Sequence, residues 1–180
     1  ILLLNPDVIL HDDFLSGLIE VAERDDTLGI LTGKLLRFDK QTLDSTGQFL
    51  RSDLSPLERG YNERDTGKYD RPEAVFSTCG AVAFYRRAML EDIQLDGEYF
   101  DESYFAFYED LDIGWRAQLA GWTAYYVPDA VAYHYRGGGL KEQQQQKRWF
   151  EHFPFLSRGS LIGKPLFIQR HVIVNRYLTL

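Results

Sequence analysis

Apolar and polar positions follow two periods along this chain, which together predict a mixed α/β fold. The apolar run 1–4 is typical of a fully buried strand that has neighbours on both sides, as central strands of parallel sheets have. From Phe14 to Ala22 apolar positions recur at helical spacing, behind Asp12 or Asp13 as a helix cap. Further apolar runs predict strands at 29–38, 74–85, 123–127 and 130–135.

Glycine, proline and polar residues mark where these elements end. Gly80 interrupts the run 74–85, and Pro128 separates the last two predicted strands. A short helix is expected at 86–93. The polar stretch 39–72 holds one expected strand, near 48–50, and loops of such length in compact domains tend to be functional or disordered. We expect a flexible joint at 137–139, a helix at 141–150, and a helix or membrane-facing element at 161–180.

The stretch 105–122 combines an aromatic cluster, a group of acids and a helical stripe. Glu109, Asp110 and Asp112 follow the aromatic cluster and fall in the first turn of a predicted helix. They could simply stabilise the helix N-terminus, by about 0.3–1 kcal/mol each. Alternatively, desolvation could raise the pKa of a carboxyl group and suit it to proton transfer. The apolar stripe of this helix is Leu111, Trp115, Leu119 and Trp122.

Composition narrows the classes of protein that the chain can represent. A single cysteine, Cys79, excludes an internal disulfide and leaves too few thiols for a structural zinc site, and we expect it to be a buried, inert thiol. The net charge is −7, but residues 134–180 carry eight Lys or Arg and two Glu. This basic end could face a membrane or a phosphorylated ligand, or it could be a solvated surface. We expect no nucleic-acid partner.

Three further positions are candidates for chemistry, and each has a plainer interpretation. Asn5-Pro6-Asp7 follows the opening strand, where a carboxylate could hold Mg²⁺ or Mn²⁺ beside a diphosphate, but it is also an ordinary turn sequence. His134 could ligate the same metal with Asp7, or be a hydrogen-bonded core residue. Arg86 and Arg87 could clamp a phosphate, or cap and solvate the helix that they begin.

The order of these motifs resembles one family. The segments 1–9, 79–90, 95–122 and 133–139 are similar to the second half of a family 2 inverting glycosyltransferase, with the rhamnosyltransferase-like members nearest. The resemblance runs from residue 1 to about residue 140. Asn5-Pro6-Asp7 is nonspecific by itself, whereas the block that ends in 105–122 is specific.

The resemblance implies a GT-A fold, which is a Rossmann-like sheet flanked by helices, and a nucleotide-diphosphate sugar donor. It places Asn5 and Asp7 at the cofactor-binding motif, with Asp7 and His134 as ligands of Mg²⁺ or Mn²⁺. It also makes Asp110 the catalytic base, supported by Glu109. The acceptor side would comprise Gly80, Arg86, Arg87 and Asp112.

On this basis we expect two parts. Residues 1–140 would be the C-terminal part of a GT-A catalytic domain without its N-terminal Rossmann-like half, and 141–180 a basic, apolar and helical extension. The expected function is transfer of a sugar, with inversion, from a dTDP-rhamnose-like or UDP-sugar donor to a glycan or lipid-linked acceptor. The expected setting is cell-surface polysaccharide synthesis in the cytoplasm, at the inner face of the membrane.

Two alternatives stay open at this point. The first is a non-catalytic remnant of the same fold that binds carbohydrate or a partner protein. The second is a metal-dependent phosphohydrolase built around Asp7, which would need more carboxylates near that residue than the sequence visibly offers.

Overall fold

The computed structural model describes residues 1–52, 55–104 and 107–135. The elements expected at 137–139, 141–150 and 161–180 lie outside the described residues. The strands are β1 (Leu2–Leu4), β2 (Val8–Leu10), β3 (Leu28–Arg37), β4 (Leu43–Ser45), β5 (Gln48–Leu50), β6 (Pro56–Glu58), β7 (Glu73–Val75), β8 (Val82–Tyr85) and β9 (Thr123–His134). The helices are α1 (Phe14–Arg24), α2 (Arg87–Ile93) and α3 (Glu109–Leu119).

A mixed sheet in the order β1-β8-β3-β9-β2 forms the centre of the described chain. β3 and β9 run parallel, while β1, β8 and β2 join antiparallel to their neighbours. β4 extends the sheet beside β3, and β7 pairs with the first half of β9. β5 and β6 form a separate two-stranded hairpin. The mixed α/β architecture is therefore confirmed.

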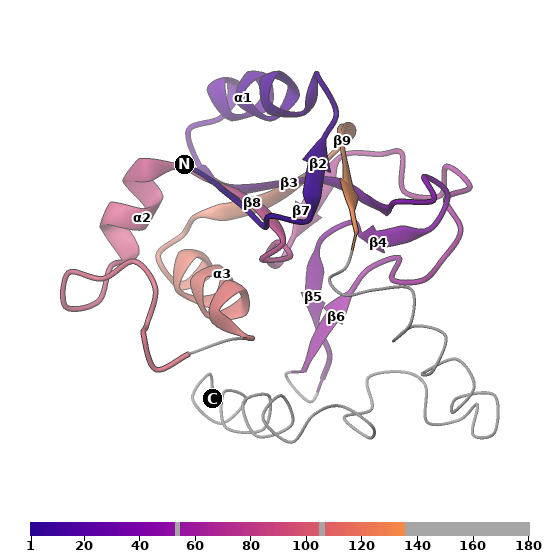
Figure 1. The fold of residues 1–180 in the computed structure, drawn as a ribbon. Coiled ribbons are helices and arrows are strands. Elements are labelled where there is room, and N and C mark those ends of the chain that lie inside the picture. Colours follow the sequence, from indigo (N-terminus) through magenta and orange to yellow (C-terminus); the bar gives the residue numbers. More distant parts are fainter. Residues whose placement is uncertain (53–54, 105–106, 136–180) are drawn as a thin grey trace, which may run out of the picture.

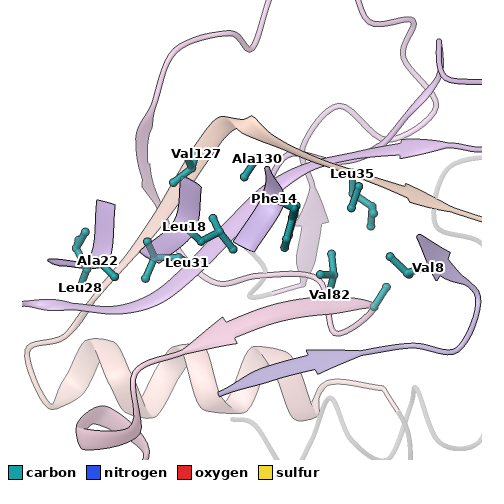
Figure 2. Close-up of a cluster of buried hydrophobic side chains, with 12 residues drawn as sticks. Val8, Phe14, Leu18, Ala22, Leu28, Leu31, Leu35, Val82, Val127 and Ala130 are labelled. Carbon is teal, nitrogen blue, oxygen red and sulfur yellow. The ribbon is translucent and has the colours of Figure 1, made fainter. Parts of the chain in front are cut away.

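Helices cover both faces of this sheet (Figure 1). α1 packs on one face, where Phe14 and Leu18 are fully buried against β3 and β9 (Figure 2). α2 and α3 pack on the opposite face, with Met89 and Ile113 fully buried there. In β3, Leu31 belongs to the core under α1 and Ile30 to the core under α2 and α3, because neighbouring side chains of a strand point to opposite faces. The result is a three-layer α/β/α arrangement.

β9 continues through Pro128, where the sequence predicted two separate strands. Its pairing with β3 shifts between Gly33 and Lys34, from Val127 to Val131, so the residues in between bulge out of the ladder. Gly33 makes this bulge possible, because a Cβ at position 33 would lie only 2.1 Å from the carbonyl oxygen of Ala130. A proline is tolerated in a strand at such a bulge.

The structure also differs from the prediction that residues 1–4 form a fully buried central strand. Within the described residues β1 pairs only with β8, and antiparallel, rather than with two parallel neighbours. Leu3 and Leu4 are correspondingly exposed.

The apolar stripe that the sequence predicted for α3 is wrong at Leu119, whose side chain is 78% exposed. The buried face of α3 centres instead on Ile113 and Ala117.

The polar stretch 39–72 contains more structure than expected. The strand expected near 48–50 is present as β5, and β4 and β6 were not predicted. Residues 43–48 are all buried, although most of them are polar. Arg59 holds this region together, because its guanidinium donates to the carbonyl and hydroxyl oxygens of Thr46 at 2.7 and 2.9 Å and stacks on three aromatic rings. These rings belong to Phe49, Tyr69 and Tyr126.

None of the helices in the described ranges is long and apolar enough to cross a membrane.

Candidate functional site

The carboxylate of Asp110 is held from two sides at the start of α3. Its Oδ2 accepts the backbone N–H of Gly80 at 2.8 Å and the side-chain amide of Gln48 at 2.9 Å. Its Oδ1 accepts the N–H of Leu111 at 2.9 Å. The residue as a whole is partly exposed, and the two bonds to Oδ2 set the orientation of its carboxylate.

The backbone under Asp110 is equally constrained. Ser77 Oγ donates to the carbonyl oxygen of Asp110 at 2.7 Å, and Phe76 meets Trp115 edge to face at 5.7 Å. Gly114 lets α3 approach this closely, because a Cβ at position 114 would lie 2.4 Å from the Cβ and Oγ of Ser77. The first turn of α3 is therefore fixed to the segment that leads into β8.

Two residues before α3 adopt a backbone conformation that side chains disfavour. Phe107 and Tyr108 have φ angles of 70° and 74°, in the left-handed region. Such residues cost about 1–3 kcal/mol each and cluster at functional sites. Tyr108 is also the N-cap of α3 and makes no side-chain capping bond, so the acids of the first turn begin directly after this strained pair.

Burial alters the acidity of two carboxyl groups in this turn. Desolvation raises the pKa of Asp110 above its usual value, against the lowering effect of its hydrogen bonds to Gly80 and Gln48. Desolvation, followed by the negative charge of Asp110, raises the pKa of Glu109 as well. Glu109 Oε2 is buried and has no hydrogen-bond partner in the described part of the chain. These raised pKa values are what the proton-transfer interpretation of 105–122 requires.

A second group of side chains meets where β2 pairs with the end of β9. His134 Nε2 lies 3.4 Å from Asp7 Oδ1, and His134 Nδ1 lies 2.7 Å from Asp44 Oδ2. Asp44 is fully buried and His134 nearly so, whereas Asp7 is partly exposed. The backbone carbonyl of Asp7 accepts the N–H of Tyr135 at 2.8 Å, which keeps the two chain segments in register.

This arrangement fits a metal that takes some of its ligands from a substrate. No group of three or more His, Cys, Asp or Glu side chains is arranged to hold a metal within the described ranges. Asp7 and His134 could offer two ligand atoms on one side, and Mg²⁺ commonly completes its shell with water and substrate phosphates. A carboxylate on the second nitrogen of a ligating histidine is also typical of metal sites, and Asp44 takes that place.

The other predicted site residues lie elsewhere or have structural contacts. Asn5 is exposed in the turn after β1. Asp112 forms an ion pair with Arg116 at 2.7 Å, which itself donates to two backbone carbonyls. Arg86 donates to the carbonyl oxygens of Leu28, Ala22 and Asp25 and so ties β3 to the end of α1.

Arg87, by contrast, is exposed and pairs with Glu91 at 2.7 Å within α2. The structure thus brings Gly80 to Asp110, and Asp7 to His134. It uses Arg86, Arg87 and Asp112 in contacts within the protein.

Two residues that contact these groups, Asp44 and Gln48, were not predicted as site residues from the sequence. Both lie in the buried polar run 43–48, which looked like part of a long loop. A polar run that contains a short apolar strand is a weak signal, and the partners of Asp44 and Gln48 are 90 and 62 residues away in the chain. Cys79 was expected to be buried but is partly exposed, and desolvation of its thiol raises the pKa well above the usual value.

Comparison with known proteins identifies the family of this chain. The family model described as "Glycosyltransferase like family 2" matches residues 1–151. N-acetylglucosaminyl-diphospho-decaprenol L-rhamnosyltransferase of Mycobacterium tuberculosis is 29% identical over 150 residues, covering 76% of this chain and 47% of that protein. Rhamnosyltransferase WbbL of Escherichia coli K12 is 31% identical over 141 residues, covering 75% of this chain and 52% of that protein.

The chain therefore spans about half the length of the curated relatives that it matches. The matched region contains every residue of the two groups described above, including Asp7, Gly80, Asp110 and His134. The resemblance inferred from the motif order is confirmed, and this chain belongs to glycosyltransferase family 2.

Proposed function

We propose that this chain carries the base and the metal-binding side of a sugar transferase active site. The observation that carries the proposal is the carboxylate of Asp110. Gly80 and Gln48 hold one of its oxygens, the other accepts the N–H of Leu111, and burial raises the pKa of the carboxyl group. A carboxylate that is held in one orientation, and whose pKa is raised by desolvation, suits the removal of a proton from a hydroxyl group.

In the proposed reaction an acceptor hydroxyl oxygen attacks the anomeric carbon of a nucleotide-diphosphate sugar. Asp110 accepts the hydroxyl proton on Oδ1 while the bond between the anomeric carbon and the diphosphate breaks. The new bond forms on the face opposite to the leaving group, so a single displacement inverts the anomeric centre. General base catalysis of this kind contributes about 10²–10⁴-fold to a rate.

Asp7 and His134 would hold Mg²⁺ or Mn²⁺ on the donor side of the site, and Asn5 would lie next to the same diphosphate. When bound, such an ion neutralises the charge that develops on a leaving diphosphate. In support of this assignment, Asp7 Oδ1 and His134 Nε2 lie 3.4 Å apart, and the contact from Asp44 leaves Nε2 as the ligating nitrogen.

The names of the two relatives support a narrower substrate class. Both are rhamnosyltransferases, and one is named for an N-acetylglucosaminyl-diphospho-decaprenol acceptor. We therefore place dTDP-rhamnose first among donors, ahead of UDP-sugars, and a lipid-linked glycan first among acceptors. Such an acceptor implies polysaccharide assembly at the cytoplasmic face of a membrane, where the basic residues of 134–180 would meet the lipid surface.

The decisive experiment replaces Asp110 by Asn in the full-length gene product. Rhamnosyl transfer from dTDP-rhamnose to N-acetylglucosaminyl-diphospho-polyprenol, measured as dTDP release, should fall by about 10²–10⁴-fold because the amide cannot accept a proton. Asp129→Asn is the matched control, since Asp129 is exposed on β9. An Asp110→Asn protein that transfers sugar at the wild-type rate would exclude Asp110 as the base.

Binding of dTDP and UDP distinguishes an enzyme from a non-catalytic remnant. Titration of either nucleotide in the presence and absence of Mn²⁺, followed by calorimetry, should show binding that depends on the metal. Absence of nucleotide binding to the full-length gene product under both conditions would favour a protein that has kept the fold without the activity.

A further inference from the structure

Gln48 lies between two carboxylates. Its Nε2 donates to Asp110 Oδ2 at 2.9 Å and to Glu58 Oε1 at 2.7 Å, which uses both protons of the amide. The opposite amide orientation would turn Oε1 toward two negatively charged groups, so these neighbours define which end is the nitrogen. In the described part of the chain, Gln48 Oε1 is buried and has no hydrogen-bond partner.

The unpartnered oxygen shows that this side chain is not placed for stability alone. A buried acceptor without a donor is unfavourable, and native structures retain few of them. Gln48 nevertheless keeps its amide turned toward Asp110 and Glu58, and its side chain is almost fully buried. The arrangement is therefore better explained by its effect on the Asp110 carboxylate, which the Gln48 amide orients.

We propose that Gln48 is a positioning residue for the general base: its amide holds Asp110 Oδ2 and leaves Oδ1 to accept the proton of the acceptor hydroxyl. This inference rests on the proposed function of Asp110. It adds a residue that neither the family assignment nor the motif order identifies.

The position of the Gln48 amide is set at both ends. Its main-chain N–H donates to the carbonyl oxygen of Ser77 at 2.9 Å, and its carbonyl accepts the N–H of Phe76 at 2.9 Å. On the far side, Ser45 Oγ donates to Glu58 Oε2 at 2.6 Å and so orients the second carboxylate. A continuous set of hydrogen bonds thus runs from β4 through the hairpin to the first turn of α3.

The donors of the side-chain hydrogen bonds named above, Ser45 Oγ and Gln48 Nε2, are neutral. Among the described residues, acidic groups near Asp110 include Glu109 on α3, Glu58 on β6, Cys79 beside Gly80, and Tyr85 on β8. Each of these groups, when ionised, opposes the ionisation of Asp110. The N–H donors of Gln48, Gly80 and Leu111 are what favour the carboxylate form, and Gln48 supplies one of the two bonds to Oδ2.

The test replaces Gln48 by Met, which has similar length and shape but no donor. We expect the pKa of the Asp110 carboxyl, measured by ¹³C NMR titration of the full-length gene product, to rise by about one unit. We also expect the acid limb of the pH profile of the transfer rate from dTDP-rhamnose to shift to higher pH by the same amount. The rate below that limb should then fall by about tenfold, with KM for the donor unchanged.

Gln118→Met is the matched control. Gln118 also joins α3 to the chain before β8, through the carbonyl oxygens of Val75 and Phe76, but it does not contact the Asp110 carboxylate. This variant should keep the wild-type pKa of Asp110 and the wild-type pH profile. If Gln48→Met does not fold, Gln48→Glu keeps the length of the side chain, and its added negative charge should raise the pKa of Asp110 further.

The outcomes separate the two proposals. An unchanged pKa of Asp110 in a folded Gln48→Met protein, alongside an inactive Asp110→Asn protein, would overturn the role of Gln48 alone. A fully active Asp110→Asn protein would instead overturn the proposed function. A raised pKa that appears equally in Gln118→Met would show a general loosening of α3 and would also overturn the role of Gln48.

Discussion

His134 Nδ1 lies 2.7 Å from a carboxylate oxygen of Asp44, and its other ring nitrogen faces Asp7 at 3.4 Å. A buried carboxylate next to one ring nitrogen favours the proton there, which leaves a lone pair on Nε2. The contact thus determines which nitrogen of His134 is free to ligate a metal together with Asp7. Asp44 itself is fully buried and 3.7 Å from Arg37 Nε, so its own position is constrained.

The first prediction concerns this pair. Asp44→Asn should weaken Mn²⁺ binding by about 10–100-fold, because an amide orients the imidazole less strongly and can donate to Nδ1, which selects the wrong tautomer. Isothermal titration with Mn²⁺ measures the affinity, and ¹⁵N NMR reports the tautomer of His134. Asp26→Asn, at an exposed ion pair with Arg86, serves as control. Equal Mn²⁺ affinities for wild type and Asp44→Asn would contradict the assignment.

A second prediction compares two glycines, Gly80, which lies against the Asp110 carboxylate, and Gly114, which packs α3 against Ser77. A Cβ at position 80 would lie 3.3 Å from Asp110 Oδ2, so Gly80→Ala should displace the carboxylate by a few tenths of an ångström. We expect the transfer rate to fall by about tenfold with little loss of stability. Steady-state kinetics and urea unfolding measure the two effects.

Gly114→Ala is the contrasting variant. Its Cβ would lie 2.4 Å from Ser77, with no room to relax, so we expect a loss of about 2–3 kcal/mol in the free energy of unfolding. A Gly80→Ala protein that loses as much stability as Gly114→Ala would show that both glycines serve packing only.

The raised pKa of Glu109 predicts a pH dependence of stability. Its folded-state pKa lies above its unfolded value, so the native state retains a proton that the unfolded state has released. The free energy of unfolding should therefore fall as pH rises from about 4 through the raised pKa. In Glu109→Gln this contribution disappears, so its stability relative to wild type should improve with rising pH.

Urea unfolding of both proteins at about pH 4.5 and 7.5 measures this difference directly. The lowered pKa values of Asp25, Asp39 and Asp101 act below about pH 4 and are common to both proteins, so they cancel. A stability difference that stays constant over this range would be inconsistent with a raised pKa at Glu109.

The fourth prediction concerns the residue that holds the hairpin β5–β6. Arg59→Lys should lower the free energy of unfolding by about 2 kcal/mol, because an ammonium group cannot stack on the rings or keep both bonds to Thr46. Urea unfolding measures the change. Arg64→Lys is the control, since Arg64 makes an exposed bond to Gln41. Similar losses for both variants would show that the stacking contributes nothing.

Local pattern was sufficient to find most of the elements but not their limits. The helical period located α1, and the short apolar runs located β3, β5 and β8. Pro128 was misjudged because a bulge depends on the partner strand, and the needed Gly33 lies 95 residues earlier. Leu119 was misjudged because spacing alone does not say which face of a helix the sheet will cover.

For the candidate site, too, the sequence predicted some residues and missed others. Asp7, Gly80, Asp110 and His134 could be chosen as candidates from the sequence, because the resemblance carried by the motif order implies these positions. Asp44 and Gln48 could not, because their importance lies in which carboxylate or imidazole they meet after folding. The assignment of Arg86 was equally open, since a guanidinium beside a helix can bind a ligand or a helix end, and here it binds the end of α1.

The sequence by itself determined that this is a mixed α/β chain of a sugar-transferase family and that its acids stand at the start of a helix. Hydrophobic periodicity and motif order are properties of the linear sequence, so they can be recognised without a structure. Only the tertiary structure decided which of the three acids is oriented by hydrogen bonds from other parts of the chain, because burial and hydrogen bonding depend on segments distant in the sequence. Asp110 meets Gly80 and Gln48, while Asp112, two residues later on the same helix, is neutralised by Arg116.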